Sequence, residues 1–245
     1  MVDPGRAGGK HVLCEKPLAL RVEDVDAMEA SARAGGVVLA EGFMYRHHAQ
    51  TLKAKEILAS GVIGEVRFVR GTFTFPMARP NDVRLRPEYG GGSLWDVGCY
   101  PLSFTQFLLD AAPVEVFGRR ADGPTGVDLT FAGQLVFASG VLAQFDCGFT
   151  SPLRAELEVA GTEGTLRVRL PWQPDPAQPM LLRRGDDVVE VPVESRERFL
   201  LEIEDLEACV RTGRAPLVSI AESRRNVRTI AALYESAREG RPVRL

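Results

Sequence analysis

Cysteine and histidine, the side chains that most often hold metals or cross-link small domains, are scarce in this sequence. Its 245 residues include four cysteines and three histidines. The cysteines stand far apart with no C-x-x-C pair, at Cys14, Cys99, Cys147 and Cys209. That spacing indicates neither a disulfide framework nor a zinc site. We therefore expect no metal site and a reducing, cytoplasmic compartment.

The chain also lacks an excess of charge of one sign and any long apolar run. The formal net charge is -3 and the two signs are interspersed, so nothing indicates a nucleic-acid surface. No apolar run approaches the roughly 20 residues that a membrane helix needs, and residues 1–6 carry no signal-peptide core. The composition, 45% hydrophobic and 26% charged, is typical of a globular fold with a sizeable core.

Residues 1–42 have the pattern of the end of an α/β unit. Short apolar runs at 11–14 and 37–40 predict buried strands, and apolar residues at helical spacing predict a helix over 22–34. A strand, a helix and a strand at this spacing form a crossover, which implies a parallel pair. Both faces of a parallel pair need cover. We therefore interpret this segment as the C-terminal remnant of a Rossmann domain.

Residues 43–245 predict a different class, an α+β domain with a large, mostly antiparallel open sheet. Helices are expected over 49–60, from the glycines at 90–92 to about Leu109, over 197–211 and over 219–240. In the last of these, Ser219 and Glu222 form a capping box. Short connections between the strands predict hairpins and hence an antiparallel meander. The expected strands are 64–75, 114–119, 127–137, 141–149, 155–160, 165–170, 180–184 and 188–191.

Glu15 and Lys16 stand at the carboxyl end of the first expected strand, where open α/β sheets place their ligands. Pro17 keeps Lys16 out of helical geometry, which favours an ammonium group projecting into a crevice. Taken alone, the same residues are more commonly explained as a surface Glu-Lys pair at a strand end.

The stretch Gly9-Lys10-His11-Val12-Leu13-Cys14-Glu15-Lys16-Pro17-Leu18 resembles the signature of the glucose–fructose oxidoreductase and inositol dehydrogenase (Gfo/Idh/MocA) family. The resemblance covers essentially the whole chain, through 41–48, 63–65, 86–101, 234–237 and 240–243. It implies a Rossmann domain followed by an open-sheet α+β domain. It also implies hydride transfer between NAD(P) and a carbinol or carbonyl carbon of a sugar, polyol or dihydrodiol-like small molecule.

The resemblance also assigns roles to residues. The lysine matching Lys16 assists catalysis beside the nicotinamide, and the glutamate matching Glu15 borders the cofactor. The tyrosine matching Tyr100 is the proposed acid/base and the aspartate matching Asp96 accompanies it. A tyrosine here, instead of histidine, favours the D-xylose dehydrogenase and dihydrodiol dehydrogenase side of the family. Because the pKa of a free tyrosine is about 10, we hypothesise that the charge of Lys16 favours its phenolate and that Asp96 orients Lys16 or a substrate hydroxyl.

Two arginines are weaker candidates for cofactor binding. Arg84 stands where some members place a cofactor-contacting arginine, and its alternative is a solvated loop charge. Arg46 is interpreted either as a cofactor or substrate contact or as a structural partner of Glu41. Trp95 is expected to wall the substrate pocket or to pack between domains. The glycines at 90–92 are expected to form a turn, because no strand precedes them and no P-loop lysine follows.

The G-x-G-x-x-G turn that should follow the first Rossmann strand does not occur in this sequence. One interpretation is an N-terminally truncated NAD(P)-dependent dehydrogenase, impaired when alone, in which NADP is the favoured cofactor. The other is a non-enzymatic oligomerising or ligand-binding module of the same family. For the chain as given we predict weak NADPH binding at most. The resemblance further implies a homodimer or homotetramer formed through the sheet. The sequence leaves the exact substrate and the choice between NAD and NADP open.

Overall fold

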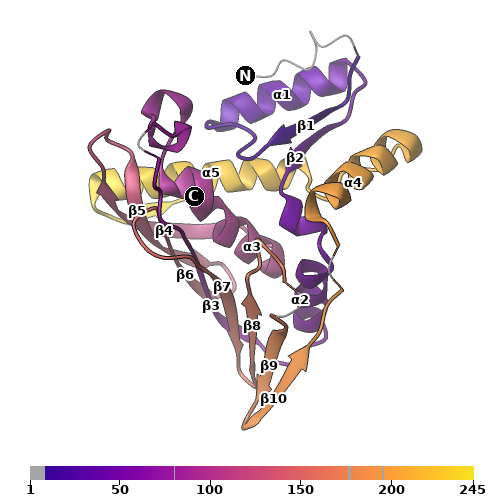
Figure 1. Ribbon diagram of the computed structural model, residues 1–245, viewed down its shortest axis with the longest axis vertical. Coiled ribbons are helices and arrows are strands. Elements are labelled where there is room, and N and C mark those ends of the chain that lie inside the picture. The colour runs from indigo at the N-terminus through magenta and orange to yellow at the C-terminus, as the bar shows by residue number, and fades with distance from the viewer. Residues whose placement is uncertain (1–8, 80, 176–177, 195) are drawn as a thin grey trace.

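The computed structural model describes residues 9–79, 81–175, 178–194 and 196–245. Two sheets organise these residues. The smaller pairs β1 (Val12–Glu15) with β2 (Leu39–Gly42) in parallel, and the intervening helix α1 (Val22–Ala34) ends at Gly35. The predicted strand–helix–strand unit is thereby confirmed, with each strand one or two residues later than expected. Figure 1 shows this unit above one end of the larger sheet.

The larger sheet has nine strands in the order β10-β9-β8-β7-β3-β6-β5-β4-β11 among the described residues. Its pairs are antiparallel except for β3 with β6, so the predicted fold class is confirmed. The bounds are β3 (Val66–Thr74), β4 (Pro113–Asp122), β5 (Asp128–Phe137), β6 (Leu142–Gly148), β7 (Arg154–Gly161), β8 (Thr165–Arg169), β9 (Met180–Arg184), β10 (Asp187–Val191) and β11 (Val243–Arg244).

The expectation of a continuous meander is wrong at one point. The chain makes two meanders, one of β4 to β6 and one of β7 to β10, and β3 lies between them. β3 pairs in parallel with β6 and antiparallel with β7, so the strands on either side of the loop at 149–153 are not neighbours. A loop of this length is compatible with a hairpin, and only long-range pairing decides that β3 is inserted there.

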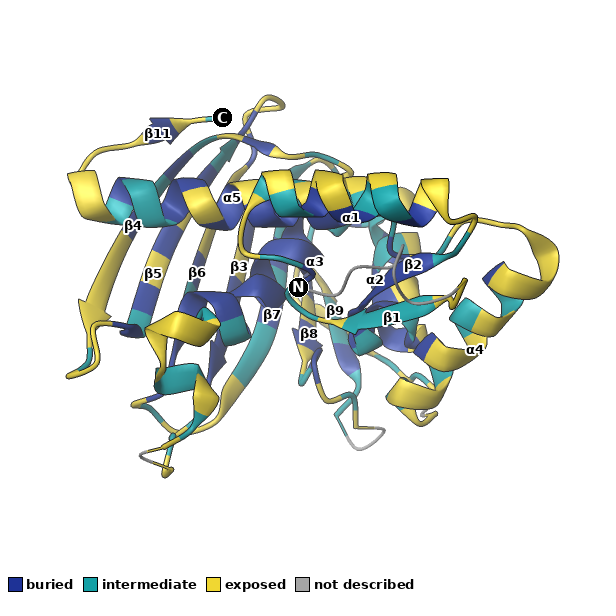
Figure 2. Cartoon of the chain, turned by 90° about the horizontal axis from the view of Figure 1, so that it is seen from above, coloured by how far each residue is buried: buried dark blue, intermediate teal, exposed yellow. Residues whose placement is uncertain are grey.

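Helices cover one face of the large sheet. The short turn η1 (Met44–His47) leads into α2 (Ala49–Ala59), and α3 (Cys99–Leu109) packs on β3. The approach is close, because a Cβ built on Gly71 of β3 would lie 2.7 Å from the Cβ of Pro101. Figure 2 shows α5 (Ile220–Glu239) running across the strands towards α1, while α4 (Arg198–Thr212) lies at the outer end with a mostly exposed surface. The predicted capping box of Ser219 and Glu222 starts α5.

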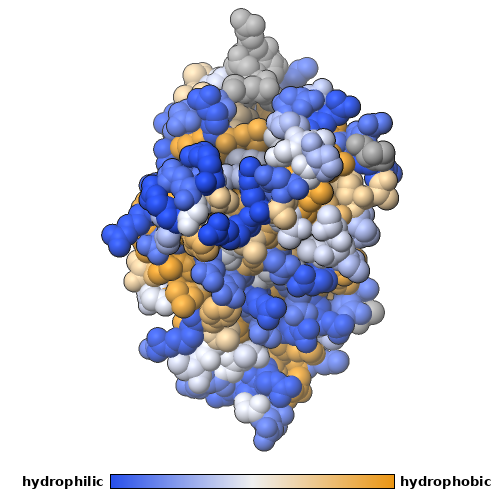
Figure 3. All heavy atoms as spheres, turned by 90° about the vertical axis from the view of Figure 1, so that its left-hand side faces the viewer, coloured by the Kyte–Doolittle hydropathy of each residue, from blue (hydrophilic) through white to orange (hydrophobic). Residues whose placement is uncertain are grey.

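The predicted division between residues 42 and 43 stays a prediction, since α1 packs on α5 across it. On the face that Figure 3 shows, hydrophilic residues are interspersed with smaller hydrophobic areas. Within the described ranges, no helix combines the length and the apolar character needed to cross a membrane.

Candidate functional site

Lys16 follows the carboxyl end of β1, and its side chain extends to Asp96, in the part of the chain that forms the large sheet. Its Nζ lies 2.6 Å from the carbonyl oxygen of Asp96 and 2.9 Å from Oδ1 of the same residue. The lysine side chain is 12% exposed. Burial opposes the charge, but the neighbouring Cys99 and Asp96 outweigh it and raise the pKa of Lys16. The structure thus brings the two predicted residues together across the two sheets and keeps Lys16 charged at neutral pH.

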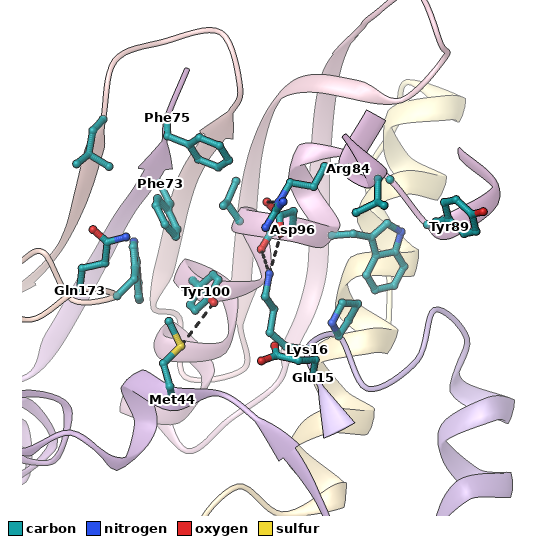
Figure 4. Close-up of a pocket in the computed structure, with 18 of the residues that line it drawn as sticks. Glu15, Lys16, Met44, Phe73, Phe75, Arg84, Tyr89, Asp96, Tyr100 and Gln173 are labelled. Atoms are coloured by element: carbon teal, nitrogen blue, oxygen red, sulfur yellow. Dashed lines mark hydrogen bonds and ion pairs between the residues drawn. The ribbon is translucent and has the colours of Figure 1, made fainter. Parts of the chain in front are cut away.

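Asp96 also holds Arg84, the first of the two candidate arginines. Nε of Arg84 donates to Oδ2 of Asp96 at 2.7 Å, and its Nη1 donates to Oδ1 of Asp82 at 3.2 Å. Burial opposes the charge of Arg84, while Asp96 and Asp82 give its pKa a net rise. Figure 4 shows Lys16 and Arg84 meeting the aspartate from opposite sides. One carboxylate is therefore shared by two cations at the edge of a cavity.

Tyr100 lies in the first turn of α3 beside this cluster. Nζ of Lys16 stands over its ring, 5.1 Å from the centroid, while its hydroxyl donates to Sδ of Met44 at 3.6 Å. Burial raises the pKa of Tyr100 well above its usual value, and Cys99 and Asp96 add to the rise. The expectation that Lys16 favours the phenolate is not met in this geometry, because the cation faces the ring and burial dominates.

A cavity of about 800 Å³ joins these groups. Glu15 at the end of β1 and the following Lys16 line it on one side, and Arg84 and Asp96, from the helical turns before α3, line it on another. Aromatic side chains form much of the remaining wall. The other residues that line it are Pro17, Met44, Phe73, Phe75, Val83, Tyr89, Gly90, Gly91, Trp95, Val97, Tyr100, Leu153, Trp172, Gln173 and Phe199. Trp95 lines the cavity, as one of its two expectations has it, and packs against the ring of Tyr234. Because Tyr234 lies in the same predicted domain, packing of Trp95 between domains stays a prediction.

Arg46 is not brought to this cavity. Its buried guanidinium donates to Oε1 of Glu222 at 3.0 Å and stacks on Phe107, 3.8 Å from the ring centroid. Its hydrogen bond is made to Glu222 of α5 and not to Glu41, the structural partner suggested by the sequence, on which Arg46 acts only through its charge. With its charge paired and its plane covered, Arg46 holds η1 against α5, and the geometry gives no support for a cofactor contact.

Asp128, at the start of β5, is a site-organising residue that sequence reasoning missed. It is 1% exposed and accepts from the Ser93 hydroxyl at 2.7 Å, the Leu94 amide at 2.8 Å and the Tyr234 hydroxyl at 2.6 Å. Burial raises its pKa despite these three bonds. A carboxylate inside an otherwise apolar strand pattern was the available signal, because buried charges need partners.

The three bonds of Asp128 fix the turn that carries the site. They hold the start of a π-helical turn, Leu94–Gly98, which presents Trp95 and Asp96 to the cavity. The preceding glycines form a turn, as predicted, with the Gly92 amide donating to the carbonyl of Arg84 at 2.9 Å. A Cβ on Gly91 would lie 2.6 Å from that carbonyl oxygen. Close backbone packing therefore requires glycine there.

Glu202 of α4 is a second residue that was not anticipated. It is 5% exposed, and within the described part of the chain its Oε2 has no hydrogen-bond partner. It lies against the end of β2, because a Cβ on Gly42 would be 3.6 Å from Oε2. Burial raises its pKa to about 7, and Glu15 contributes. Near the carboxyl ends of β1 and β2, this side chain can change charge close to neutral pH.

The same described residues contain no group of three or more histidine, cysteine, aspartate or glutamate side chains placed to hold a metal ion. The functional groups at hand are thus an ammonium, a carboxylate, a guanidinium and a phenol around one cavity. This set can bind, orient and protonate an oxygen atom of a small molecule.

Comparison with known proteins assigns both parts of the chain. The GFO/IDH/MocA C-terminal domain model matches residues 51–167, and the model of the oxidoreductase family with an NAD-binding Rossmann fold matches residues 6–43. D-xylose 1-dehydrogenase (NADP(+)) 2 of Haloferax volcanii is 35% identical over 241 residues, which are 97% of this chain and 74% of that protein.

Two further proteins are similar to this chain over at least 95% of its length. Trans-1,2-dihydrobenzene-1,2-diol dehydrogenase of Mus musculus is 30% identical, covering 95% of this chain and 71% of that protein. The crystal structure of aldose-aldose oxidoreductase from Caulobacter crescentus with glycerol superposes with a TM-score of 0.91 at 31% identity, covering 99% of this chain and 74% of that one. The chain therefore belongs to the Gfo/Idh/MocA family of NAD(P)-dependent oxidoreductases.

Proposed function

We propose that this protein transfers a hydride between NAD(P) and a carbinol or carbonyl carbon of a sugar, polyol or dihydrodiol-like small molecule. The observation that carries the proposal is the convergence on one cavity of Lys16, which follows β1, with Asp96 of the π-helical turn and Tyr100 of α3. Two relatives are named as dehydrogenases of D-xylose and of a dihydrodiol, which agrees with this choice.

The residues present fit the reactive end of the cofactor. When bound, a nicotinamide ring supplies or accepts the hydride. Glu15 and Lys16 stand at the carboxyl edge of the parallel strands, the position at which α/β sheets hold ligands, and would border that ring. Arg84, which is 42% exposed at the rim, is the one candidate arginine placed to contact the cofactor. NADP is the favoured form, in line with the NADP(+) in the name of the Haloferax relative.

The acid/base role falls to Tyr100, supported by Lys16 and Asp96. As a neutral phenol, Tyr100 can donate its proton to a substrate oxygen during carbonyl reduction. In the reverse reaction Tyr100 takes the proton of the substrate hydroxyl, while the Lys16 ammonium, which faces the tyrosine ring, supplies the positive charge of the site. Asp96 holds that ammonium in place through two contacts. The three residues thus have separate tasks of proton transfer, charge stabilisation and orientation.

Activity is tested by following reduced nicotinamide while the chain is incubated with millimolar NADP⁺ or NAD⁺ and D-xylose, D-glucose or trans-dihydrobenzenediol. We expect sugar- or diol-dependent reduction that falls by about 10²- to 10⁴-fold in Tyr100→Phe and Lys16→Met. Lys53→Met is the matched control, because Lys53 lies in an exposed pair with Glu56 on α2. Undiminished turnover in either site variant would contradict the assigned roles.

Dinucleotide affinity is a separate expectation. Among the described residues, no strand leads through a glycine-rich turn into a helix that would hold a pyrophosphate. We therefore predict that NADPH binds this chain only weakly. Fluorescence titration measures the dissociation constant directly, and micromolar or tighter binding would contradict the prediction.

We also propose a homodimer or homotetramer formed through the open face of the large sheet. A hollow on β3, β7 and β8 is lined by charged and polar residues, including Arg70, Glu158 and Arg167. Mixed charges of this kind are compatible with a polar self-complementary contact. Analytical ultracentrifugation of the chain tests this, and association should weaken when Arg70 and Arg167 are replaced by glutamate.

A further inference from the structure

The wall of the cavity that faces away from the Lys16 cluster is apolar, with one polar side chain. Phe73 comes from β3 and Phe75 follows that strand directly. Trp172 and Gln173 come from the segment after β8, and Leu153 from the loop before β7. In Figure 4, Phe73 and Gln173 lie to one side of Tyr100, and Lys16, Asp96 and Arg84 to the other. The cavity therefore has a reacting side and a recognition side.

The ionisable groups on the reacting side are balanced. Two cations, Lys16 and Arg84, and two carboxylates, Glu15 and Asp96, line the cavity. Both cations are already bound to Asp96, and Arg84 also contacts Asp82. A phosphate group would compete with Asp96 for both cations and would be repelled by the Glu15 and Asp96 carboxylates. The balance of charge disfavours a phosphorylated ligand.

Gln173 is the available hydrogen-bonding group on the recognition side. Its side-chain amide lines the cavity, is exposed, and makes no hydrogen bond within the described part of the chain. The backbone N–H of Gln173 donates to the backbone carbonyl of Leu170 at 3.0 Å. A carboxamide both donates and accepts, which matches a hydroxyl group.

The segment that carries Gln173 is fixed by its neighbour. Trp172 is 0% exposed, stacks on Phe73 with 5.8 Å between ring centroids, and meets Tyr45 edge-on at 5.3 Å. This packing fixes the backbone position immediately before Gln173. The side-chain carboxamide of Gln173 therefore extends into the cavity from a fixed point of the backbone. A polar group held in this way gives specificity at a small entropic cost.

We propose that this cavity selects a neutral, unphosphorylated sugar and that Gln173 binds a hydroxyl remote from the reacting carbon. The apolar ring face of the sugar then lies against the side chains of Phe73, Phe75 and Leu153. The inference rests on the proposed function, since the reacting carbon is defined by Tyr100 and Lys16. A ring diol without further hydroxyls would occupy the same reacting side but leave Gln173 without a partner.

The two tryptophans of the chain provide a direct readout of binding. Trp95 and Trp172 both line the cavity, and the sequence contains no others. The ¹⁵N-labelled chain therefore gives two indole N–H signals, both from cavity walls. Their shifts on titration yield dissociation constants into the millimolar range without any dinucleotide, so binding is measured separately from turnover.

The ligands are D-xylose, D-xylose 5-phosphate and trans-dihydrobenzenediol. We expect the phosphate to bind at least tenfold more weakly than D-xylose. Gln173→Leu should weaken D-xylose binding by about three- to tenfold, the loss of one hydrogen bond, and leave the diol unchanged. Gln178→Leu, the same replacement in the same segment but outside the cavity lining, should leave all three constants unchanged.

Three results would overturn the inference. The first is binding of the phosphate as tight as or tighter than that of D-xylose, and the second is no binding of D-xylose at all. The third is an equal effect of Gln173→Leu on D-xylose and on the diol. Selective D-xylose binding with no cofactor-dependent turnover would instead count against the proposed function alone.

Discussion

Two buried carboxylates near the site, Asp128 and Glu202, differ in how their oxygen atoms are hydrogen-bonded. Asp128, in the large sheet, accepts three hydrogen bonds from Ser93, Leu94 and Tyr234. Glu202, where α4 meets the two-stranded sheet, has an unpartnered Oε2 within the described residues and lies near another acid, Glu15. The first carboxylate is a structural anchor, and the second is a destabilised, titratable group.

The difference identifies which side of the site is preorganised. The large domain presents Trp95 and Asp96 from a turn whose backbone is fixed by Asp128. The two-stranded side presents Glu15 and Lys16 from a strand of four residues with one parallel neighbour. A fixed turn holds Asp96 in a defined position, while the charge of Glu202 near Glu15 changes with pH. We therefore expect the geometry of the site to be set by the large-sheet side.

The largest effect is expected from Asp128→Ala. The Ser93 hydroxyl, the Leu94 amide and the Tyr234 hydroxyl would lose their acceptor in a buried place. We expect a loss of about 3 kcal/mol or more in the free energy of unfolding, which thermal denaturation would register as a melting temperature lower by roughly 6–12 °C.

The control for that experiment is Asp146→Ala on the adjacent strand β6. Asp146 forms a partly exposed ion pair with Arg154 and should contribute little. Equal destabilisation by the two replacements would show that Asp128 is not a special anchor, and the contrast with Glu202 would lose its basis.

A smaller, pH-dependent effect is expected from Glu202→Gln. The pKa of Glu202 in the fold is about 7, above its ordinary value of 4.5. The folded state therefore holds a proton that the unfolded state has lost, and its stability falls as the pH rises through this interval. The cost is absent below about pH 4.5 and complete above about pH 7.

We expect Glu202→Gln to raise stability by on the order of 2 to 3 kcal/mol at pH 8 and to change it little at pH 4.5. Melting curves of both proteins at the two pH values measure this difference. Glu207→Gln, an exposed position on the same helix, should show no such pH-dependent gain. A gain that is equal at both pH values would mean that the charge of Glu202 is not its cause.

The smallest effect is expected from Asp26→Asn. Asp26 of α1 forms an ion pair with Arg224 of α5, with Nε and Oδ1 2.7 Å apart, and so links the two parts of the molecule. Both side chains are nearly half exposed, and such pairs are screened by solvent and salt. We expect no measurable change in melting temperature. A clear drop would show that surface charge, and not packing of α1 on α5, holds the two-stranded unit.

Local patterns predicted individual elements well and their pairing less well. The helix over 22–34 and the capping box at Ser219 and Glu222 are found as predicted, because helical spacing and end signals are local. The insertion of β3 between β6 and β7 was not predicted, since strand order depends on contacts between distant segments. The same limit explains why Asp128 and Glu202 were missed. The residues that define their roles, Ser93, Leu94 and Tyr234 for Asp128 and Glu15 and Gly42 for Glu202, are distant in the sequence.

The sequence by itself determined the family, the fold class and the candidate set of Lys16, Asp96 and Tyr100, because these rest on ordered motifs and periodicity. The tertiary structure decided which side chains meet. It placed Arg84 on Asp96, removed Arg46 to Glu222, and set Lys16 over the ring of Tyr100 and not beside its hydroxyl. It also decided the charge states, since burial, which raises the pKa of Tyr100 and of Glu202, exists only after distant segments have packed together.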